Sequence, residues 1–526
     1  MRKGRLEKIP LSLFLHFYQP WQQQPDILER IVEESYKPIL EIFANNRQAR
    51  ATFSFPAGLI RLLQNKGYSD VIDKLKKLVE RNQIELTGTA AYHGFLPLLP
   101  VSEIKRQILL NEETLNQFFG KAHTRSGFFP PELAFSYKVA KIVTRLGFKW
   151  MAIPMISLGH KIPDYTSLFK LNGYNLYLFP RHKWASSVVL SGNVRSKKSF
   201  LNWIKNEQPR GYYLLIMDGE TFGHHRPGLE ELLQELCTAS EFELLQVSDL
   251  FKKFTKVENV KPREASWSNE EQDFWLDREK KIIAKNPFLL WKDPKNPIHK
   301  LQWQQTALAI KVIKDFKLKI GNSNLMRWKK ARDMLDKALA SDQYWWASAK
   351  PWWSLEMTEA GSWQLVQVVK TATGGKSEFT KQAEILYRKI LNKAFFWQRS
   401  GYIRKKHRQI SGAILQPFAK RAPAEWYNQI ILEFEDEMRR AAQLYEFEKA
   451  IKWRDAVHKL KTGADVFDVL HVVDELQAAR KIPSLKPFLL YKEVEVSKFA
   501  KKYLQKLSKT EIVKGKENLR KQGFKV

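Results

Sequence analysis

The feature that most constrains the fold is a regular alternation of short apolar runs and amphipathic helical segments between Leu11 and Asp218. The helical segments place apolar residues at i, i+3, i+4 and i+7, as in DILERIVEESYKPILEIF and SEIKRQILLNEETLNQFF. Alternating strands and helices favour right-handed β-α-β crossovers and a parallel sheet. We therefore predict an α/β fold in which seven strands close into a (β/α) barrel. The seven runs are LSLFLHF (11–17), ATFSFP (51–56), IELTGTA (84–90), SGFFPPE (126–132), WMAIP (150–154), NLYLFPR (175–181) and YYLLIMD (212–218).

The alternation stops near residue 255, and the rest of the chain has a different character. A Trp-rich stretch with helical spacing follows, then a basic segment, a strongly helical segment and a tail rich in lysine. We expect the helical Trp-rich region to complete the cleft of the barrel. The predicted divisions are a catalytic barrel (1–255), a helical Trp-rich domain (256–400), a basic linker (401–425), a helical hairpin (426–465) and a basic, helical or partly disordered tail (466–526).

Composition restricts the location and chemistry. Cys237 is the only cysteine, so neither an intrachain disulfide nor a cysteine-based zinc site can form. The basic start MRKGRLEK precedes a run of about nine apolar residues with a histidine inside it, which is typical of a buried strand and not of a signal peptide. No run approaches the ~18 apolar residues that cross a bilayer. These features predict a cytoplasmic protein without a membrane partner.

Polar side chains suited to catalysis stand where the apolar runs end, at His16, His93, Glu132, Arg181 and Asp218. In α/β barrels the carboxyl ends of the strands surround the active site. Glu132 and Asp218 lie far apart in sequence, so they can meet only across the mouth of the barrel. A carboxylate pair of this kind suits glycoside hydrolysis, in which one group attacks the anomeric carbon and the other protonates the leaving oxygen.

Four stretches resemble, in order and spacing, the signatures of glycoside hydrolase family 57. They are LHFYQP (15–20), GTAAYHGFLPLLP (88–100), GFFPPELAFS (127–136) and MDGETFGHH (217–225). SWS (266–268) and WKDPKNPIH (291–299) are similar to the later motifs of the family, so the resemblance spans about residues 10–300.

Membership would imply a seven-stranded barrel, action on α-glucosidic bonds of an α-glucan or maltooligosaccharide with retention, and no required metal or cofactor. Glu132 matches the nucleophile of the family and Asp218 its general acid/base. The sequence departs from the family at Tyr18, where a second histidine is usual, and at Gly94, where proline is common. These departures bear on substrate specificity. The substrate-binding residues that we predict are His16, Gln19, His93, Glu220, His224 and Trp267, the last by stacking on a sugar face.

The predicted mechanism requires Glu132 to be ionised for attack and Asp218 to be protonated for donation, so their environments should separate their pKa values. Retention requires carboxyl groups about 5 to 5.5 Å apart, whereas inversion requires about 6.5 to 9.5 Å. Hydrolysis and 4-α-glucan transfer share the glycosyl-enzyme intermediate, and the sequence does not choose between them.

The run LEFEDEMRRAAQLYEFEKAIKWRD, within residues 431–461, resembles the UVR motif, a small interaction hairpin. Its apolar residues form two stripes at helical spacing. The resemblance implies a protein partner or self-pairing of this hairpin.

Two alternatives remain open from the sequence. His16, His93 and Asp218 could converge on a metal, as in a metal-dependent carbohydrate deacetylase on a related barrel. The chain could instead be a non-catalytic binding or scaffold protein that acts through its hairpin and basic tail. The formal net charge of +32 keeps nucleic acid open as a partner, although we do not expect it, because charge governs association and not the reaction.

Overall fold

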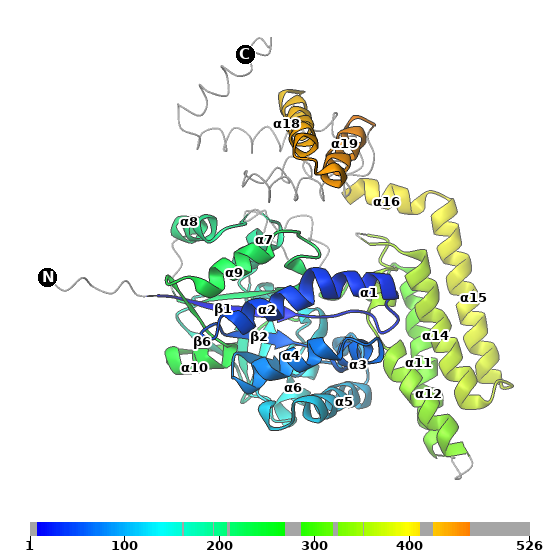
Figure 1. The fold of residues 1–526 in the computed structure, drawn as a ribbon. Coiled ribbons are helices and arrows are strands. Elements are labelled where there is room, and N and C mark those ends of the chain that lie inside the picture. Colours follow the sequence, from blue (N-terminus) through cyan, green and yellow to red (C-terminus); the bar gives the residue numbers. More distant parts are fainter. Residues whose placement is uncertain are drawn as a thin grey trace. The chain divides into compact units, whose positions relative to one another are not determined.

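The computed structural model describes residues 8–159, 162–192, 194–207, 211–268, 286–318, 324–350, 352–410 and 424–462 (Figure 1). The chain divides into two compact units, Met1–Lys406 and His407–Val526, and each is described by itself. The first unit contains two β-sheets with their helices and a helical bundle, and the second contains a helical hairpin.

The first sheet has the strand order β3-β2-β1-β8, and β9 also pairs with β1. All of its pairings are parallel, and His16 lies beside both Ser54 and Asp218 in register. Its carboxyl edge therefore brings the ends of three strands together. The strands are β1 (Ile9–His16), β2 (Ala51–Ser54), β3 (Ile84–Thr87), β8 (Tyr213–Asp218) and β9 (Phe242–Leu244).

The second sheet has the order β10-β6-β7-β5-β4, in which only the pairing of β6 with β7 is antiparallel. Three of these strands come from predicted runs, whereas β6 and β10 were not predicted. The strands are β4 (Gly127–Phe128), β5 (Trp150–Ile153), β6 (Leu168–Leu171), β7 (Tyr177–Pro180) and β10 (Val257–Val260).

The predicted closed barrel is wrong, although every predicted run contains a strand. A single parallel bridge, Gly88 to Phe128, joins the two sheets on one side. Pro130 and Pro131 follow β4 and carry no N–H, so this strand ends after two residues. On the other side β7 ends at Pro180, and the His182 amide donates a hydrogen bond of 2.8 Å to the Leu214 carbonyl without forming a strand pair.

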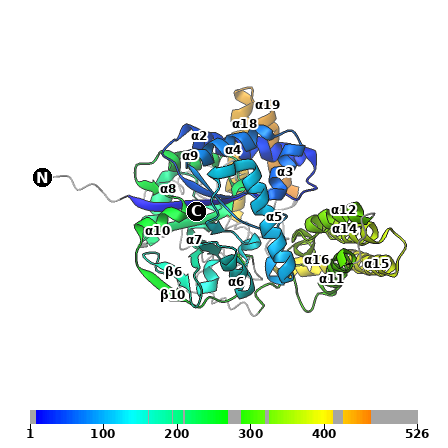
Figure 2. The ribbon, with the colours of Figure 1, turned by 90° about the horizontal axis from the view of Figure 1, so that it is seen from below.

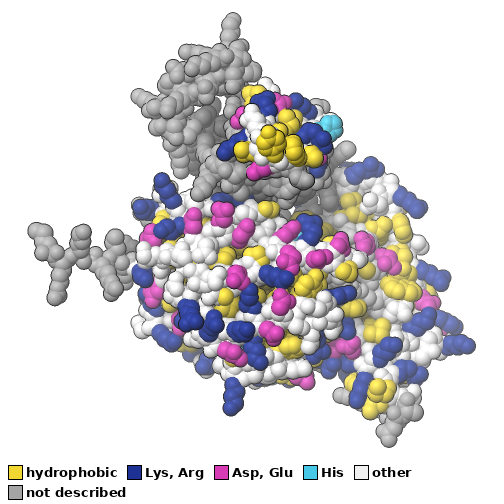
Figure 3. Space-filling view, viewed as in Figure 1, with side chains coloured by type: hydrophobic (Ala, Val, Ile, Leu, Met, Phe, Trp, Pro, Cys, Tyr) yellow, Lys and Arg dark blue, Asp and Glu magenta, His cyan; other side chains and the backbone are white. Residues whose placement is uncertain are grey.

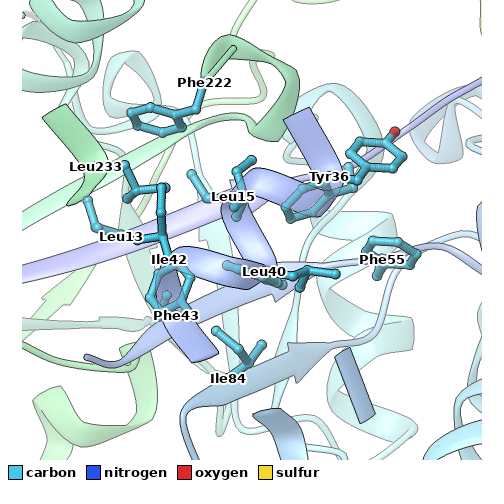
Figure 4. Close-up of a cluster of buried hydrophobic side chains, with 14 of the residues drawn as sticks. Leu13, Leu15, Tyr36, Leu40, Ile42, Phe43, Phe55, Ile84, Phe222 and Leu233 are labelled. Carbon is cyan, nitrogen blue, oxygen red and sulfur yellow. The ribbon is translucent and has the colours of Figure 1, made fainter. Parts of the chain in front are cut away.

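Helices surround the sheets because alternate strand residues point to opposite faces. Leu13 and Leu15 of β1 pack against the helices with Leu40 and Phe43, as Figure 4 shows. Phe14 lies between Leu13 and Leu15 in sequence. It packs instead with Trp150, in a separate cluster of buried hydrophobic side chains. The helices here are α1 (Pro25–Ile31), the π-helix η1 (Val32–Tyr36), α2 (Lys37–Asn45), α3 (Ala57–Asn65), α4 (Ser69–Glu80), α5 (Val101–Phe119), α6 (Tyr137–Arg145), α7 (Lys183–Leu190), α8 (Lys197–Glu207), α9 (Glu230–Thr238) and α10 (Leu250–Lys253).

The helical bundle of the first unit lies beside α5 (Figure 2). Two ion pairs attach it: the buried Arg332 of the bundle contacts the buried Glu103 at 2.8 Å, and the partly exposed Arg106 contacts the buried Asp336 at 2.6 Å. Removing one partner of a buried pair leaves the other charge uncompensated, so these pairs hold the bundle in one orientation. Its helices are α11 (Pro297–Leu318), α12 (Leu325–Ala338), α13 (Asp342–Trp345), α14 (Leu355–Thr373), α15 (Glu378–Arg399) and α16 (Tyr402–Ile410).

The second unit contains the hairpin of α18 (Ala424–Gln443) and α19 (Phe447–Thr462). Phe434 and Trp453 pack between the helices with ring centroids 5.5 Å apart. The predicted basic tail, 466–526, lies outside the described residues. Among the residues that are described, no helix combines the length and apolar character needed to cross a bilayer.

Candidate active site

Glu132 is held in an unusual backbone conformation directly after β4. Its φ of 60° and ψ of 20° are left-handed, and Leu133 follows with φ of 49°. Such a conformation costs a non-glycine residue about 1 to 2 kcal/mol. The Trp267 amide donates to the Glu132 carbonyl at 3.1 Å, and the Trp267 indole Nε1 donates to the Glu132 carboxyl Oε2 at 2.8 Å. Trp267 therefore fixes both the backbone and the carboxyl group, a pattern of strain typical of functional sites.

Asp218 ends β8 in register with His16, at the carboxyl edge of the first sheet. Its charge raises the pKa of Glu132, so the two carboxyl groups face one site. Arg181, which follows β7, lowers the pKa of Asp218, and its guanidinium carbon lies 5.5 Å from the Trp267 ring centroid. Glu132 and Arg181, which follow strands of the second sheet, thus contact one indole, and Asp218 of the first sheet lies within electrostatic reach of both. Glu132 and Asp218 are half-buried, so solvent and small ligands can reach them.

The two carboxyl groups differ in pKa, as predicted, but in the opposite order. Burial raises the pKa of Glu132 to about 8, and the charges of Asp218 and Asp342 add to this while the Trp267 hydrogen bond opposes it. Burial raises the pKa of Asp218 only to about 6, because Arg181 stabilises its charge. Burial therefore favours the protonated form of both carboxyl groups, and it does so more strongly for Glu132. No cation contributes to the Glu132 pKa, and this difference is the physical reason for the reversed order.

Glu220 lies two residues after Asp218 in the sequence, and its side chain is buried. It accepts hydrogen bonds from the loop that follows β1. Its Oε1 accepts hydrogen bonds from the Tyr36 hydroxyl at 2.5 Å, the Gln19 amide nitrogen at 3.2 Å and the Tyr18 backbone amide at 3.3 Å. Burial, with the charge of Asp218, raises the pKa of Glu220 to about 7. The hydrogen bond between Gln19 and Glu220 therefore orients this loop beside Asp218.

His16 and His93 contact each other through their Nε2 atoms, which are 3.1 Å apart. His93 Nδ1 lies 3.1 Å from the Ser341 hydroxyl oxygen. Burial lowers the pKa of His93 to about 3 and lowers that of His16 well below its usual value, so both rings are neutral at pH 7. His16 Nδ1 is buried without a hydrogen-bond partner.

The structure adds a residue that the sequence analysis did not single out, Asp342, the first residue of α13. The Tyr18 hydroxyl donates to Asp342 Oδ2 at 2.6 Å, and the Tyr18 ring stacks on His93 at a centroid distance of 3.9 Å. Tyr18, where the family pattern has histidine, thus connects the strand edge to the bundle. The signal in the sequence was an acidic residue inside ASDQYWWASA, a stretch otherwise dominated by aromatic and small residues.

His224 is not joined to the carboxyl pair. Its Nδ1 lies 2.6 Å from Glu34 Oε2 of η1, and its side chain is 18% exposed. The remaining predicted residues, His16, Gln19, His93, Glu220 and Trp267, surround the Glu132 and Asp218 site through the contacts given above. Within the described ranges, no three His, Cys, Asp or Glu side chains are grouped as metal ligands would be.

A carboxyl pair of unequal pKa at the ends of parallel strands, flanked by an indole, is the kind of site that glycosidases use. Residues 12–262 match the family model Glycosyl hydrolase family 57, which confirms the predicted family over this segment. The chain is 25% identical over 266 residues to alpha-amylase 1 of Dictyoglomus thermophilum, covering 49% of this chain and 38% of the relative. It is 20% identical over 268 residues to the 4-alpha-glucanotransferase of Thermococcus litoralis, covering 48% and 40%. The chain thus spans about two fifths of the length of these relatives.

Solved structures share the fold. A GH57-type branching enzyme from Pyrococcus horikoshii superimposes with a TM-score of 0.55 at 15% identity, covering 73% of this chain and 95% of that chain. The alpha-amylase AmyC of Thermotoga maritima gives 0.54 at 13% identity, covering 73% and 97%. The fold of the first unit is therefore one that is found among family 57 structures.

Proposed function

We propose that this protein cleaves α-glucosidic bonds of an α-glucan or maltooligosaccharide with retention, passing the glycosyl group to water or to a sugar hydroxyl. The carboxyl pair carries this proposal, because Glu132 and Asp218 face one half-buried site and share one proton near neutral pH. The amylase and glucanotransferase relatives support the choice of substrate.

In the proposed reaction Glu132 attacks the anomeric carbon while Asp218 protonates the departing glucan oxygen. This division of charge is the reverse of the order of the two pKa values, so substrate binding must favour ionised Glu132 and protonated Asp218. Glucan in the site displaces water, and its glycosidic oxygen gives a proton on Asp218 a hydrogen-bond acceptor. Asp218, once ionised, then removes a proton from the acceptor hydroxyl, and attack by that oxygen releases Glu132.

Incubation of the full chain with maltoheptaose tests this function. Chromatography should detect shorter products, together with longer ones if a sugar accepts the glycosyl group, and NMR should show that new reducing ends are first formed as the α-anomer. Initial formation of the β-anomer would contradict retention. Intact maltoheptaose, together with release of acetate from an acetylated chitooligosaccharide that is lost on chelation and recovered with a divalent ion, would instead favour the metal-dependent deacetylase.

The pH dependence of turnover should follow the carboxyl pair. Below pH about 6 both groups are protonated and no nucleophile remains, and above pH about 8 both are ionised and no acid remains. We expect kcat/KM for maltoheptaose to be greatest between these values and to fall about tenfold per pH unit on either side. A profile that is flat from pH 5 to pH 9 would contradict a shared proton.

We propose further that the UVR-like hairpin pairs with the hairpin of a second copy. Its exposed apolar side chains include Leu444, Tyr445, Phe447 and Ile451, and Figure 3 shows hydrophobic side chains gathered on one face of the hairpin beside Lys and Arg. In sequence, α18 has five acidic and two basic residues whereas α19 has two acidic and five basic residues. A two-fold arrangement would place unlike helices together and cover the apolar turn.

Sedimentation velocity tests this pairing on the full chain. We expect a dimer that forms with increasing protein concentration, and we expect Phe447→Asp to weaken its association at least about tenfold by placing a charge in the apolar contact. His458→Gln, an exposed position of α19 away from the turn whose change leaves the formal charge unaltered, is the control. A wild-type chain that stays monomeric at tens of micromolar would contradict self-pairing.

A further inference from the structure

An exposed pair of aromatic rings lies on the helical bundle. Trp363 of α14 is 44% exposed, and its ring centroid is 5.3 Å from that of Tyr387 of α15, with 51° between the planes. The Tyr387 hydroxyl donates to Glu359 Oε1 at 2.6 Å, and its ring packs against the buried core of the bundle. Tyr387 is therefore fixed at both ends, and it supports Trp363 in an orientation that leaves much of the indole open to solvent.

The polar surroundings of these rings match a carbohydrate better than an apolar partner. Glu359 and Gln367 stand one helical turn before and after Trp363 on α14, and both are half-exposed. A pyranose has apolar C–H faces and hydroxyl groups around its edge, so it needs aromatic rings flanked by such hydrogen-bonding groups. The tilt between the two rings suits a curved chain, in which successive sugar faces are not coplanar.

These rings face away from the carboxyl pair. Gly361, two residues before Trp363, packs on Gln343 of α13, since an added Cβ would lie 2.3 Å from the Gln343 Cβ. Gln343 adjoins Asp342 of the candidate active site. Two residues on an α-helix are separated by about 200°, so Trp363 lies on the opposite side of α14.

We infer that Trp363 and Tyr387, with Glu359 beside them, form a second, non-catalytic binding site for an α-glucan chain. This inference rests on the proposed function for its substrate class. The site would hold a long or branched glucan by its sugar faces while another part of the same molecule occupies the active site, and would thereby favour polymers over short oligosaccharides.

Native gel electrophoresis with glycogen in the gel tests this site. All variants carry Glu132→Gln, so that the glycogen is not degraded, and mobility is compared with that in a glycogen-free gel. We expect Trp363→Ala and Trp363→Gln to raise the apparent Kd for glycogen about fivefold or more, because the stacking face is lost. Trp363→Phe, which keeps a ring, should stay within about twofold of the parent. Phe396→Ala removes a ring of α15 that is 61% exposed and should leave the mobility unchanged.

Equal retardation of the parent and both ring-removing variants would overturn the inference, provided that circular dichroism shows the parent fold in at least one of them. If Phe396→Ala weakened the retardation as much as the Trp363 substitutions do, the inference would also be overturned, because the loss of glycogen binding would not be specific to Trp363. Turnover of maltoheptaose by the wild-type chain is measured separately. Turnover without Trp363-dependent retardation would leave the proposed function in place and reject this site. Trp363-dependent retardation without turnover would reject the proposed function and keep a glucan-binding site.

Discussion

Replacement of Glu132 by glutamine should lower kcat for maltoheptaose by about 10⁴-fold or more, because an amide cannot attack the anomeric carbon. Binding should persist, since the amide has nearly the shape of the carboxyl group and its oxygen can still accept the Trp267 hydrogen bond. Stopped assays give kcat, and calorimetry with maltoheptaose gives the binding constant. Turnover near that of the wild-type chain would reject Glu132 as the nucleophile.

Glu132→Gln should not weaken the fold. Burial raises the pKa of Glu132 to about 8, so ionisation of this group opposes folding as the pH rises above its unfolded value. Glutamine removes that titration, and the melting temperature at pH 8 should equal or exceed that of the wild-type chain. Glu113→Gln, the same change on an exposed face of α5, is the matched control and should retain full turnover.

A small nucleophile should separate loss of chemistry from loss of structure. In Glu132→Ala, azide can enter the vacated space and attack the anomeric carbon of α-maltosyl fluoride as fluoride departs. The product expected from attack on that face is the β-linked azide, formed in one inverting step. An α-linked azide would place the attacking group on the other face of the sugar and contradict the assigned role.

Asp218→Asn should show the second large effect, and its size should depend on the leaving group. For maltoheptaose we expect a loss of about 10³-fold or more, since asparagine cannot protonate the departing oxygen. Fluoride needs little protonation, so the first turnover of α-maltosyl fluoride should fall less than about tenfold. Rapid-quench measurement of fluoride release provides the comparison.

Equal losses on maltoheptaose and α-maltosyl fluoride would assign Asp218 a role other than proton donation. Asp73→Asn, on an exposed face of α4, is the matched control for the substitution. Asp218→Asn also tests the pH dependence, because the first turnover of the fluoride by this variant should depend only on ionisation of Glu132. It should rise with pH through the pKa of that group and should not fall again at high pH.

The strand runs and their polar ends could be read from the sequence because both follow from local periodicity. Every predicted run contains a strand, and His16 and Asp218 stand at adjacent strand ends in register. β6, β9 and β10 escaped prediction because a charged residue interrupts each of them, whereas equally short strands such as β2 and β4 lie within longer uncharged runs, ATFSFP and SGFFPP. Closure of the barrel could not be predicted from local sequence patterns. It depends on the hydrogen bonds that form between strands, and a strand as short as β4 offers its neighbours few of them.

The amino-acid sequence was enough to predict the chemical groups and the edge at which they gather: carboxylates and imidazoles at the ends of parallel strands, in the order of family 57 motifs. The contact of Asp342 with Tyr18, the pairing of His224 with Glu34 and the stronger rise of the Glu132 pKa became visible only in the folded chain. The physical reason is that proton affinity depends on burial and on neighbouring charge. For Glu132 and Asp218, those neighbours are supplied by segments distant in the chain.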